Sequence, residues 1–273
     1  FQSAITRWAL NKGRACIFAG TGLGKTRQAL AWADAVVSRT RKPVLILTPL
    51  AVGPQFVREA DAAGIGGVAI HGGSTSRIVV CNYQKLHQLT PADYGGVVLD
   101  ESSILKSYSG STNAALRDAF AGTPYKLACT ATPSPNDVEE LGNHAAFLGV
   151  CTRAEMLATY FVHDSSDTSK WRLKGYAEED FWKWVAGWAM VMRHPRDIGF
   201  GAPAGYDLPP LHIVEHSVDS TPQGGRLFAV PAGTLSEKRA ARKQTFGDRV
   251  KCVADLVNGD DAQWVVWCER NAE

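Results

Sequence analysis

A short apolar run that opens into a glycine-rich loop is the feature that most constrains the fold of this chain. Residues 15–19 are apolar and predict a buried strand, and three glycines follow within residues 20–24. Lys25 and Thr26 come directly after the loop and begin an amphipathic segment that ends near residue 37. A strand, a glycine loop, a lysine, a hydroxyl and a helix in this order are typical of sites that hold nucleotide phosphates.

The residues of this loop suit the phosphate chain of a nucleotide. Glycines allow backbone N–H groups to come close to the phosphates, and the start of the helix adds the positive end of its dipole. We expect Lys25 to reach the β- and γ-phosphates and the Thr26 hydroxyl to hold Mg²⁺. An ordinary glycine turn before a helix is the alternative, and the strand and helix on either side disfavour it. The predicted nucleotide-binding residues of the loop are Gly20, Thr21, Gly22, Leu23, Gly24, Lys25 and Thr26.

Further apolar segments predict a parallel sheet that is covered by helices. Residues 43–50 hold an apolar run, and residues 68–71 and 77–83 predict two more strands. Strands that alternate with helical patterns favour right-handed β-α-β units and a doubly wound α/β fold. Such sheets bind their ligands at the carboxyl ends of the strands. At that edge we expect the glycine loop, Thr48, Asn82 and Tyr83.

Two adjacent carboxylates end the next apolar run. Residues 96–99 predict a strand, and Asp100 and Glu101 follow it. Buried carboxylates are costly unless a cation compensates them, so a purely structural role for this pair is disfavoured. In an ATPase built on a glycine loop, the first acid completes the Mg²⁺ shell and the second activates the water that attacks the γ-phosphate. We therefore predict Lys25, Asp100 and Glu101 as catalytic residues, with Thr26 and Asp100 on the metal.

Another predicted strand, at residues 125–129, leads into two threonines and a proline-rich turn. Hydroxyl groups next to the acid pair are able to bond the carboxylates, because a hydroxyl both donates and accepts. We expect Thr130 and Thr132 to couple the state of the γ-phosphate to the rest of the domain. A capped turn that opens the helix near Asp137 is the alternative interpretation, and it is compatible with that role.

Composition and charge exclude several classes of protein. The 273 residues are 45% apolar and 21% charged, as in ordinary globular proteins, and no apolar run is long enough to span a membrane. The six cysteines include no C-x-x-C pair, which favours a reducing, cytoplasmic setting over disulfides or zinc. The net charge is only +2, but residues 1–60 carry nine basic and two acidic side chains. A phosphate-rich partner and a solvated surface explain this excess equally well.

Six motifs resemble those of superfamily-two DNA helicases and occur in the same order. They are Gln2 and residues 19–26, 47–50, 81–83, 100–103 and 130–133. Ala19 stands where the strict glycine-loop pattern has a further glycine, and this variant is found in helicase-type ATPases. The Gly-Leu-Gly-Lys-Thr spelling and the Ser-Pro-Asn tail after Pro133 look most like the Swi/Snf branch, especially phage and prophage helicase-like proteins. The resemblance covers residues 1 to about 140.

This resemblance implies a RecA-like fold, ATP and Mg²⁺ as cofactors, and a nucleic-acid partner, DNA rather than RNA. It implies that Gln2 reads the adenine edge, although a surface glutamine without a role is the alternative. It places Thr48, Asn82 and Tyr83 near the nucleic-acid backbone. Ser103 departs from the His or Asp that many relatives have there, so no contact of that residue is carried over.

The character of the chain changes after residue 140. Residues 178–192 predict an aromatic-rich helix, and its apolar stripe is expected to be buried in a small helical subdomain rather than stacked on bases. That stripe consists of Phe181, Trp184, Val185, Trp188 and Met192. The basic side chains of the preceding loop, which are Lys170, Arg172 and Lys174, are candidates for phosphate contact.

The last part resembles the opening of a second RecA-like domain. Residues 211–218 and 263–271 predict strands, and residues 235–257 predict a basic helical stretch. We expect the arginine fingers of that domain to lie beyond Glu273, since Arg270 comes too early in it. The chain also begins at Phe1 rather than at a methionine, so we expect a piece of a longer protein.

The predicted organisation is a first RecA-like ATPase domain over residues 1–150, a helical insertion and connector over 151–210, and a linker with the truncated opening of a second RecA-like domain over 211–273. The predicted function is an ATP-dependent DNA translocase or helicase, in which nucleic-acid-stimulated ATP hydrolysis drives movement on DNA. We expect this piece alone to hydrolyse ATP weakly.

Two other functions stay open. One is a nucleotide-gated DNA-binding subunit of a restriction or defence complex, with protein partners in such a complex or in a phage. The other is a P-loop phosphotransferase, which the acid pair and residues 130–133 disfavour. No membrane partner is expected, and the predicted location is the cytoplasm.

Overall fold

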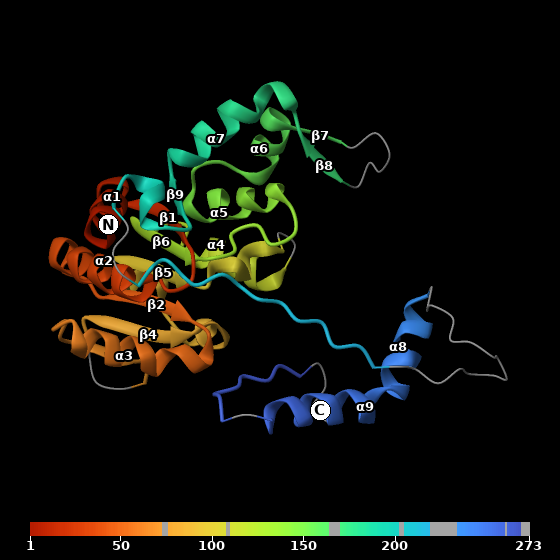
Figure 1. Ribbon diagram of the computed structural model, residues 1–273. Helices are drawn as coiled ribbons and strands as arrows, with labels where there is room; N and C mark the ends of the chain where they lie inside the picture. Colours follow the sequence, from red (N-terminus) through yellow and green to blue (C-terminus); the bar gives the residue numbers. More distant parts are fainter. Residues whose placement is uncertain are drawn as a thin grey trace. The chain divides into compact units, whose positions relative to one another are not determined.

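Seven strands form the largest sheet in the part of the chain that the structure describes (Figure 1). The strand order is β3-β4-β2-β5-β6-β1-β9, and every neighbouring pair runs parallel. The strands are β1 Arg14–Ala19, β2 Val44–Thr48, β3 Val68–Ile70, β4 Ile78–Asn82, β5 Gly96–Asp100, β6 Tyr125–Thr130 and β9 Ala189–Met192. The computed structural model describes residues 1–72, 76–107, 110–163, 170–201, 205–218, 234–259 and 261–268.

Helices cover both faces of this sheet (Figure 1). On one face lie α1 Gln2–Lys12, α2 Lys25–Thr40 and α3 Gly53–Ala62, and on the other lie α4 Ser111–Ala119, α5 Leu141–Leu148, α6 Arg153–Tyr160 and α7 Glu178–Ala186. Successive strand residues alternate between the two cores, so that Ile17 packs in one with Trp32 and Phe18 packs in the other with Phe147. Both faces of the strands are apolar because both are covered. The predicted doubly wound α/β fold is confirmed.

Short elements connect the strands and helices. The 3-10 helices are η1 Leu50–Val52, η2 Tyr83–Gln88, η3 Pro91–Asp93, η4 Ser102–Lys106, η5 Val138–Glu140, η6 Gly175–Ala177 and η7 Pro195–Ile198. A separate antiparallel pair is formed by β7 Phe161–His163 and β8 Trp171–Leu173. The sequence predicted a loop at residues 170–174, and the strand β8 corrects that expectation.

The predicted helix over residues 178–192 is wrong in its second half. The helix α7 ends at Ala186, and residues 189–192 form β9, which pairs parallel with β1. Without β9 this side of β1 would be an open edge, and the backbone N–H of Cys16 accordingly donates to the carbonyl of Trp188 at 2.9 Å. A short apolar run fits either a buried helix or a strand, and here the edge of β1 selects the strand.

Most of the predicted aromatic stripe is buried, but in the core of the large sheet and not in a separate helical subdomain as expected. Phe181, Val185 and Trp188 lie in the core on the α7 face of the sheet, while Trp184 is partly buried against it. Met192 belongs to the opposite core, because β9 carries it to the other face. Trp182, outside the stripe, is 43% exposed.

Residues Pro209–Glu273 form a unit separate from Phe1–Leu208. Its helices are α8 Leu235–Gln244 and α9 Phe246–Val257, which confirm the predicted helical stretch. Residues 211–218 and 263–268 form no strand, so the strands predicted there are wrong for the described residues. A strand needs a hydrogen-bonded neighbour, and the apolar pattern alone did not supply one. Arg270 lies outside the described residues. None of the helices that the structure describes is both long and apolar enough to cross a bilayer.

Candidate nucleotide-binding site

A cavity of about 490 Å³ lies at the carboxyl ends of β1 and β5. It is lined by Gln2, Thr21, Gly22, Gly24, Lys25, Thr26, Arg27, Val52, Gln55, Glu59, Asp100, Glu101 and Tyr206. The structure thus brings together most of the predicted loop residues, both acids and the predicted adenine reader. These residues are far apart in the sequence, and parallel strands place them at one edge of the sheet.

The glycine loop needs glycine for two different reasons. Gly22 and Gly24 have φ angles of 79° and 80°, in the left-handed region that other residues rarely adopt. A Cβ at Gly22 would meet nothing within 4 Å, so only its backbone conformation requires glycine. A Cβ at Gly24 would collide with the side-chain amide of Gln2. Gln2 is thereby packed directly against the loop.

Leu23 serves the loop through its backbone rather than its side chain. The side chain is buried, with 3% of its surface exposed, and it faces the core instead of the cavity. Its carbonyl accepts hydrogen bonds from Nε2 of Gln2 at 3.2 Å and from Nε2 of Gln28 at 3.0 Å. Two side-chain amides therefore fix the middle of the loop.

Lys25 is the first residue of α2, and its ammonium group bends back over the loop. Nζ donates to the carbonyl of Ala19 at 2.9 Å and to the carbonyl of Gly20 at 3.1 Å. These carbonyls hold the ammonium group of Lys25 at the carboxyl end of β1. The first backbone N–H groups of α2 have no partner within the helix, so the same place favours an anion.

Asp100 ends β5 and is buried beneath the cavity. Its Oδ2 accepts a 2.9 Å hydrogen bond from the hydroxyl of Thr48, and its backbone carbonyl accepts one of 2.6 Å from the hydroxyl of Tyr83. Burial raises the pKa of Asp100 to about 6; the Thr48 hydroxyl and the Lys25 ammonium oppose this shift, and the Glu101 carboxylate adds to it. The carboxylate lacks enough positive charge around it within the protein.

Glu101 has an unusual backbone for a residue with a side chain. Its φ of 53° and ψ of 54° lie in the left-handed region, which costs roughly 1 kcal/mol or more for such a residue. Its Oε2 accepts a 3.4 Å hydrogen bond from the hydroxyl of Thr130, whose oxygen also accepts from the N–H of Thr132 at 3.1 Å. Of the two predicted coupling threonines, Thr130 therefore contacts the second acid, and Thr132 contacts Thr130.

The residues expected near nucleic acid occupy different environments. The side chains of Thr48 and Tyr83 are buried, with 1% and 8% of the residues exposed, and both hydroxyls bond to Asp100. Neither hydroxyl faces a nucleic acid in this conformation. Asn82 is half-buried and caps η2 by accepting from the backbone N–H of Lys85 at 3.1 Å. Their contact with nucleic acid stays a prediction, and Asp100 is the partner that the structure gives to the two hydroxyls.

Tyr206 is a cavity residue that the sequence did not indicate. It lies in the segment predicted as a connector, and its ring meets the ring of Phe1 edge-on at a centroid distance of 5.3 Å. Gln2 lines the same cavity, so an aromatic ring and a side-chain amide lie on one side of the glycine loop. An aromatic residue in an irregular segment so far from the loop carries no local signal of this role.

The oxygen atoms at this site suit a hard divalent cation. Thr26 and Asp100 supply a hydroxyl and a carboxylate, and the raised pKa of Asp100 shows that a nearby positive charge would relieve an unfavourable burial. Within the described residues no group of three or more His, Cys, Asp or Glu side chains could hold a metal alone. Mg²⁺ does not require such a cage, because it is commonly held by one or two carboxylates together with phosphates and water.

No protein-family model matches this chain, and no curated protein matches it. Solved structures do match. The Sulfolobus solfataricus SWI2/SNF2 ATPase core in complex with dsDNA is 19% identical, with a TM-score of 0.59 over 70% of this chain and 43% of that chain. The Sulfolobus solfataricus SWI2/SNF2 ATPase core domain is 19% identical, with a TM-score of 0.53 over 68% of this chain and 41% of that one.

A third match, the Pyrococcus furiosus Hef helicase domain, is 20% identical over 54% of this chain and 35% of that one, with a TM-score of 0.45. This chain spans about two fifths of the length of the SWI2/SNF2 structures. At these identities the likeness establishes the fold alone: the parallel sheet and its flanking helices match part of the two SWI2/SNF2 structures.

Proposed function

We propose that this chain is the nucleotide-binding domain of a DNA-stimulated ATPase that moves along DNA. The observation that carries the proposal is the meeting of Lys25, Thr26, Asp100 and Glu101 in one cavity. An ammonium group, a hydroxyl and two adjacent carboxylates are among the groups that proteins use for phosphoryl transfer to water.

In this proposal the glycine loop and α2 bind the phosphates of ATP. The backbone N–H groups of the loop approach the phosphate oxygens, and Lys25 exchanges the carbonyls of Ala19 and Gly20 for the β- and γ-phosphates. The amide of Gln2 already donates to Leu23, which leaves its Oε1 to accept from the amino group of adenine. Tyr206 offers a ring on which the base can stack.

Thr26 and Asp100 would hold Mg²⁺, which neutralises phosphate charge when it is bound. Glu101 accepts a proton from the attacking water, and its carboxylate is oriented by the Thr130 hydroxyl. Thr48 keeps Asp100 directed at the cavity by donating to the other side of the carboxylate. These residues act by positioning groups and by stabilising charge, which supply most of the catalysis of phosphoryl transfer.

DNA is the proposed partner, along which the protein would move. The fold likeness to a SWI2/SNF2 core that was solved with dsDNA supports this partner. Thr48 and Asn82 end neighbouring strands at the same sheet edge as the cavity. DNA bound at these residues would therefore act on Asp100 through the hydrogen bond from the Thr48 hydroxyl. Contacts to the phosphodiester backbone would make binding salt-dependent and nearly independent of sequence.

The test is ATP hydrolysis by the full-length protein with and without duplex DNA, with Glu101→Gln as the matched variant. We expect DNA to stimulate release of phosphate to water, and the variant to bind nucleotide but lose turnover. Nucleotide binding without hydrolysis, with or without DNA, would replace the motor by a nucleotide-gated DNA-binding subunit. Transfer of labelled γ-phosphate to a small molecule would replace it by a phosphotransferase.

A further inference from the structure

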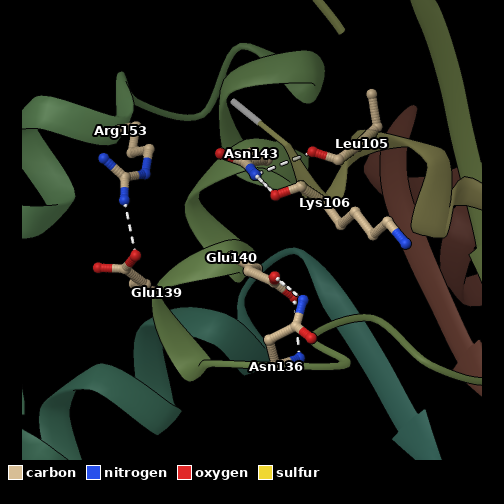
Figure 2. Close-up of polar contacts among 7 residues, drawn as sticks. All are labelled: Leu105, Lys106, Asn136, Glu139, Glu140, Asn143 and Arg153. Atoms are coloured by element: carbon tan, nitrogen blue, oxygen red, sulfur yellow. Dashed lines mark hydrogen bonds and ion pairs between the residues drawn. The ribbon is translucent and has the colours of Figure 1, made fainter. Parts of the chain in front are cut away.

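Helix α5 holds the turn that follows the two acids through two adjacent side chains. The turn η4 begins at Ser102, directly after Glu101, and both Asn143 and His144 of α5 bond to it. Figure 2 shows the amide of Asn143 directed at the backbone carbonyls of Leu105 and Lys106. These contacts lie outside the cavity, and no motif in the sequence includes Asn143 or His144.

Asn143 fixes the far end of the turn. It is 1% exposed, and its Nδ2 donates to the carbonyl of Leu105 at 2.8 Å and to that of Lys106 at 2.9 Å. The last carbonyls of a short helix have no partner within it, so a buried amide that serves two of them determines where the turn ends. Asn113 of α4 adds a second donor to Leu105 at 2.8 Å.

His144 fixes the near end of the turn. Its Nε2 lies 3.1 Å from the hydroxyl of Ser102 in a hydrogen bond, and both residues are fully buried. The ring also meets Phe18 of β1 edge-on at a centroid distance of 5.1 Å, so its orientation is set by packing. Ser102 is thus anchored one residue after Glu101.

Glu101 lies between these two anchors and the end of β5, and its backbone is strained. Glu101 adopts the left-handed conformation, which persists only where the surroundings impose it. Among the described residues, its own side chain accepts a long hydrogen bond from the hydroxyl of Thr130 at 3.4 Å. The anchors on the following residues are therefore the main restraint on where its carboxylate lies.

We infer that Asn143 and His144 are positioning residues that hold Glu101 in place for the attack of water on the γ-phosphate. This inference rests on the proposed function and deepens it, because it assigns the second acid a support outside the nucleotide site. Nucleotide binding and hydrolysis are therefore separable in the test: Asn143 and His144 bond to the turn after Glu101, and neither residue is part of the cavity lining.

An ion pair in the segment just before α5 gives a matched control. Figure 2 shows Glu139, in η5 just before α5, paired with Arg153 of α6 at 2.9 Å, away from the turn. Glu140 in the same segment accepts from the side-chain amide of Asn136 at 2.7 Å. Replacing Glu139 by glutamine disturbs the setting of α5 but removes no bond to η4.

The experiment compares four variants of the full-length protein. His144→Leu and Ser102→Ala break the hydrogen bond between His144 and Ser102. In His144→Gln the side-chain amide can replace the imidazole Nε2, and Glu139→Gln is the control. Each is measured for ATP turnover, for affinity of a fluorescent ATP analogue, and for hydrogen exchange of the amides of residues 101–106. We expect His144→Leu and Ser102→Ala to lower turnover about tenfold or more, to leave nucleotide affinity within about twofold, and to speed exchange in the turn. His144→Gln should keep the turnover that His144→Leu loses. Glu139→Gln should match the unsubstituted protein in turnover, nucleotide affinity and amide exchange.

Equal turnover and equal exchange in all variants would overturn the inference. A parallel loss of turnover and nucleotide affinity would also overturn it, because it would show general damage to the domain. If His144→Leu destabilises the fold, Ser102→Ala, which removes one oxygen, decides the question. Absence of hydrolysis by the unsubstituted protein would instead remove the proposed function, while the exchange of residues 101–106 would still show whether His144 holds the turn.

Discussion

The hydroxyl of Thr48 donates a 2.9 Å hydrogen bond to Oδ2 of Asp100 in the buried interior of the domain. It joins the end of β2 to the end of β5 immediately beneath the cavity. The contact gives a residue expected on the nucleic-acid side of the protein a direct connection to the residue expected on Mg²⁺.

Removal of this hydroxyl should weaken the binding of Mg²⁺ at the nucleotide site. In Thr48→Val the carboxyl of Asp100 loses a donor that lowers its pKa, so the charged form becomes less favourable. We expect a several-fold rise in the Mg²⁺ concentration needed for binding and a loss of about 2 kcal/mol of stability. Titration of a fluorescent ATP analogue at a series of Mg²⁺ concentrations measures the first effect. Thr48→Ser keeps the hydroxyl and is the control; identical Mg²⁺ dependence in Thr48→Val would contradict the account.

The ammonium of Lys25 should strengthen nucleotide binding because of its position over the glycine loop and not only because of its charge. Lys25→Ala removes the group that lies over Ala19 and Gly20, and we expect at least about tenfold weaker binding of ATP, equivalent to ~1.4 kcal/mol. Arg7→Ala makes the same change of charge at an exposed position that does not line the cavity. Equilibrium titration of both variants decides the point, and equal affinities would mean that the loop does not bind the phosphates.

Tyr206 should contribute to binding through its ring. Stacking of a base on an aromatic side chain is worth about 1–3 kcal/mol, so Tyr206→Ala is expected to weaken ATP binding roughly tenfold. Tyr206→Phe keeps the ring and should bind as the unsubstituted protein does. If inorganic triphosphate loses as much affinity as ATP in Tyr206→Ala, the ring does not contact the base.

Much of this site follows from local patterns in the sequence. The glycine loop, Lys25 and the acid pair are defined by neighbours along the chain, and each stands at the end of an apolar strand. Parallel strands must place such ends at one edge, so their convergence could be predicted before any contact was known.

Other parts depend on partners that no local pattern reveals. β9 exists because the edge of β1 needs a neighbour, and the same apolar residues fit a helix equally well. The direction of the Thr48 and Tyr83 hydroxyls, inward to Asp100, depends on which strands lie side by side. Tyr206 lines the cavity and His144 bonds to the turn after Glu101, both from distant segments, where a tyrosine in a connector and a histidine in an apolar helix carry no distinctive spacing.

The buried imidazole of His144 should make the fold sensitive to acid. Burial lowers the pKa of His144 from 6.5 to about 4, so between these values the unfolded chain binds a proton that the folded chain does not. Stability from this group is therefore complete above pH 6.5 and is lost as the pH falls towards 4, by about 1.4 kcal/mol per pH unit and about 3 kcal/mol in all.

Urea unfolding at pH 7, 6 and 5 measures this slope. His144→Gln cannot take up the proton and should flatten the curve over this range, while His87→Gln, at an exposed position, should leave it unchanged. An unchanged slope in His144→Gln would mean that another group causes the acid sensitivity.

The most direct measurement of the central claim is the affinity of the full-length protein for ATP with Mg²⁺ and with EDTA, compared between the unsubstituted protein and Asp100→Asn. We expect Mg²⁺ to strengthen binding by the unsubstituted protein, and Asp100→Asn to lose most of this gain while still binding nucleotide through the glycine loop. Binding that is equally strong in all four measurements, or absent from all of them, would contradict the central claim.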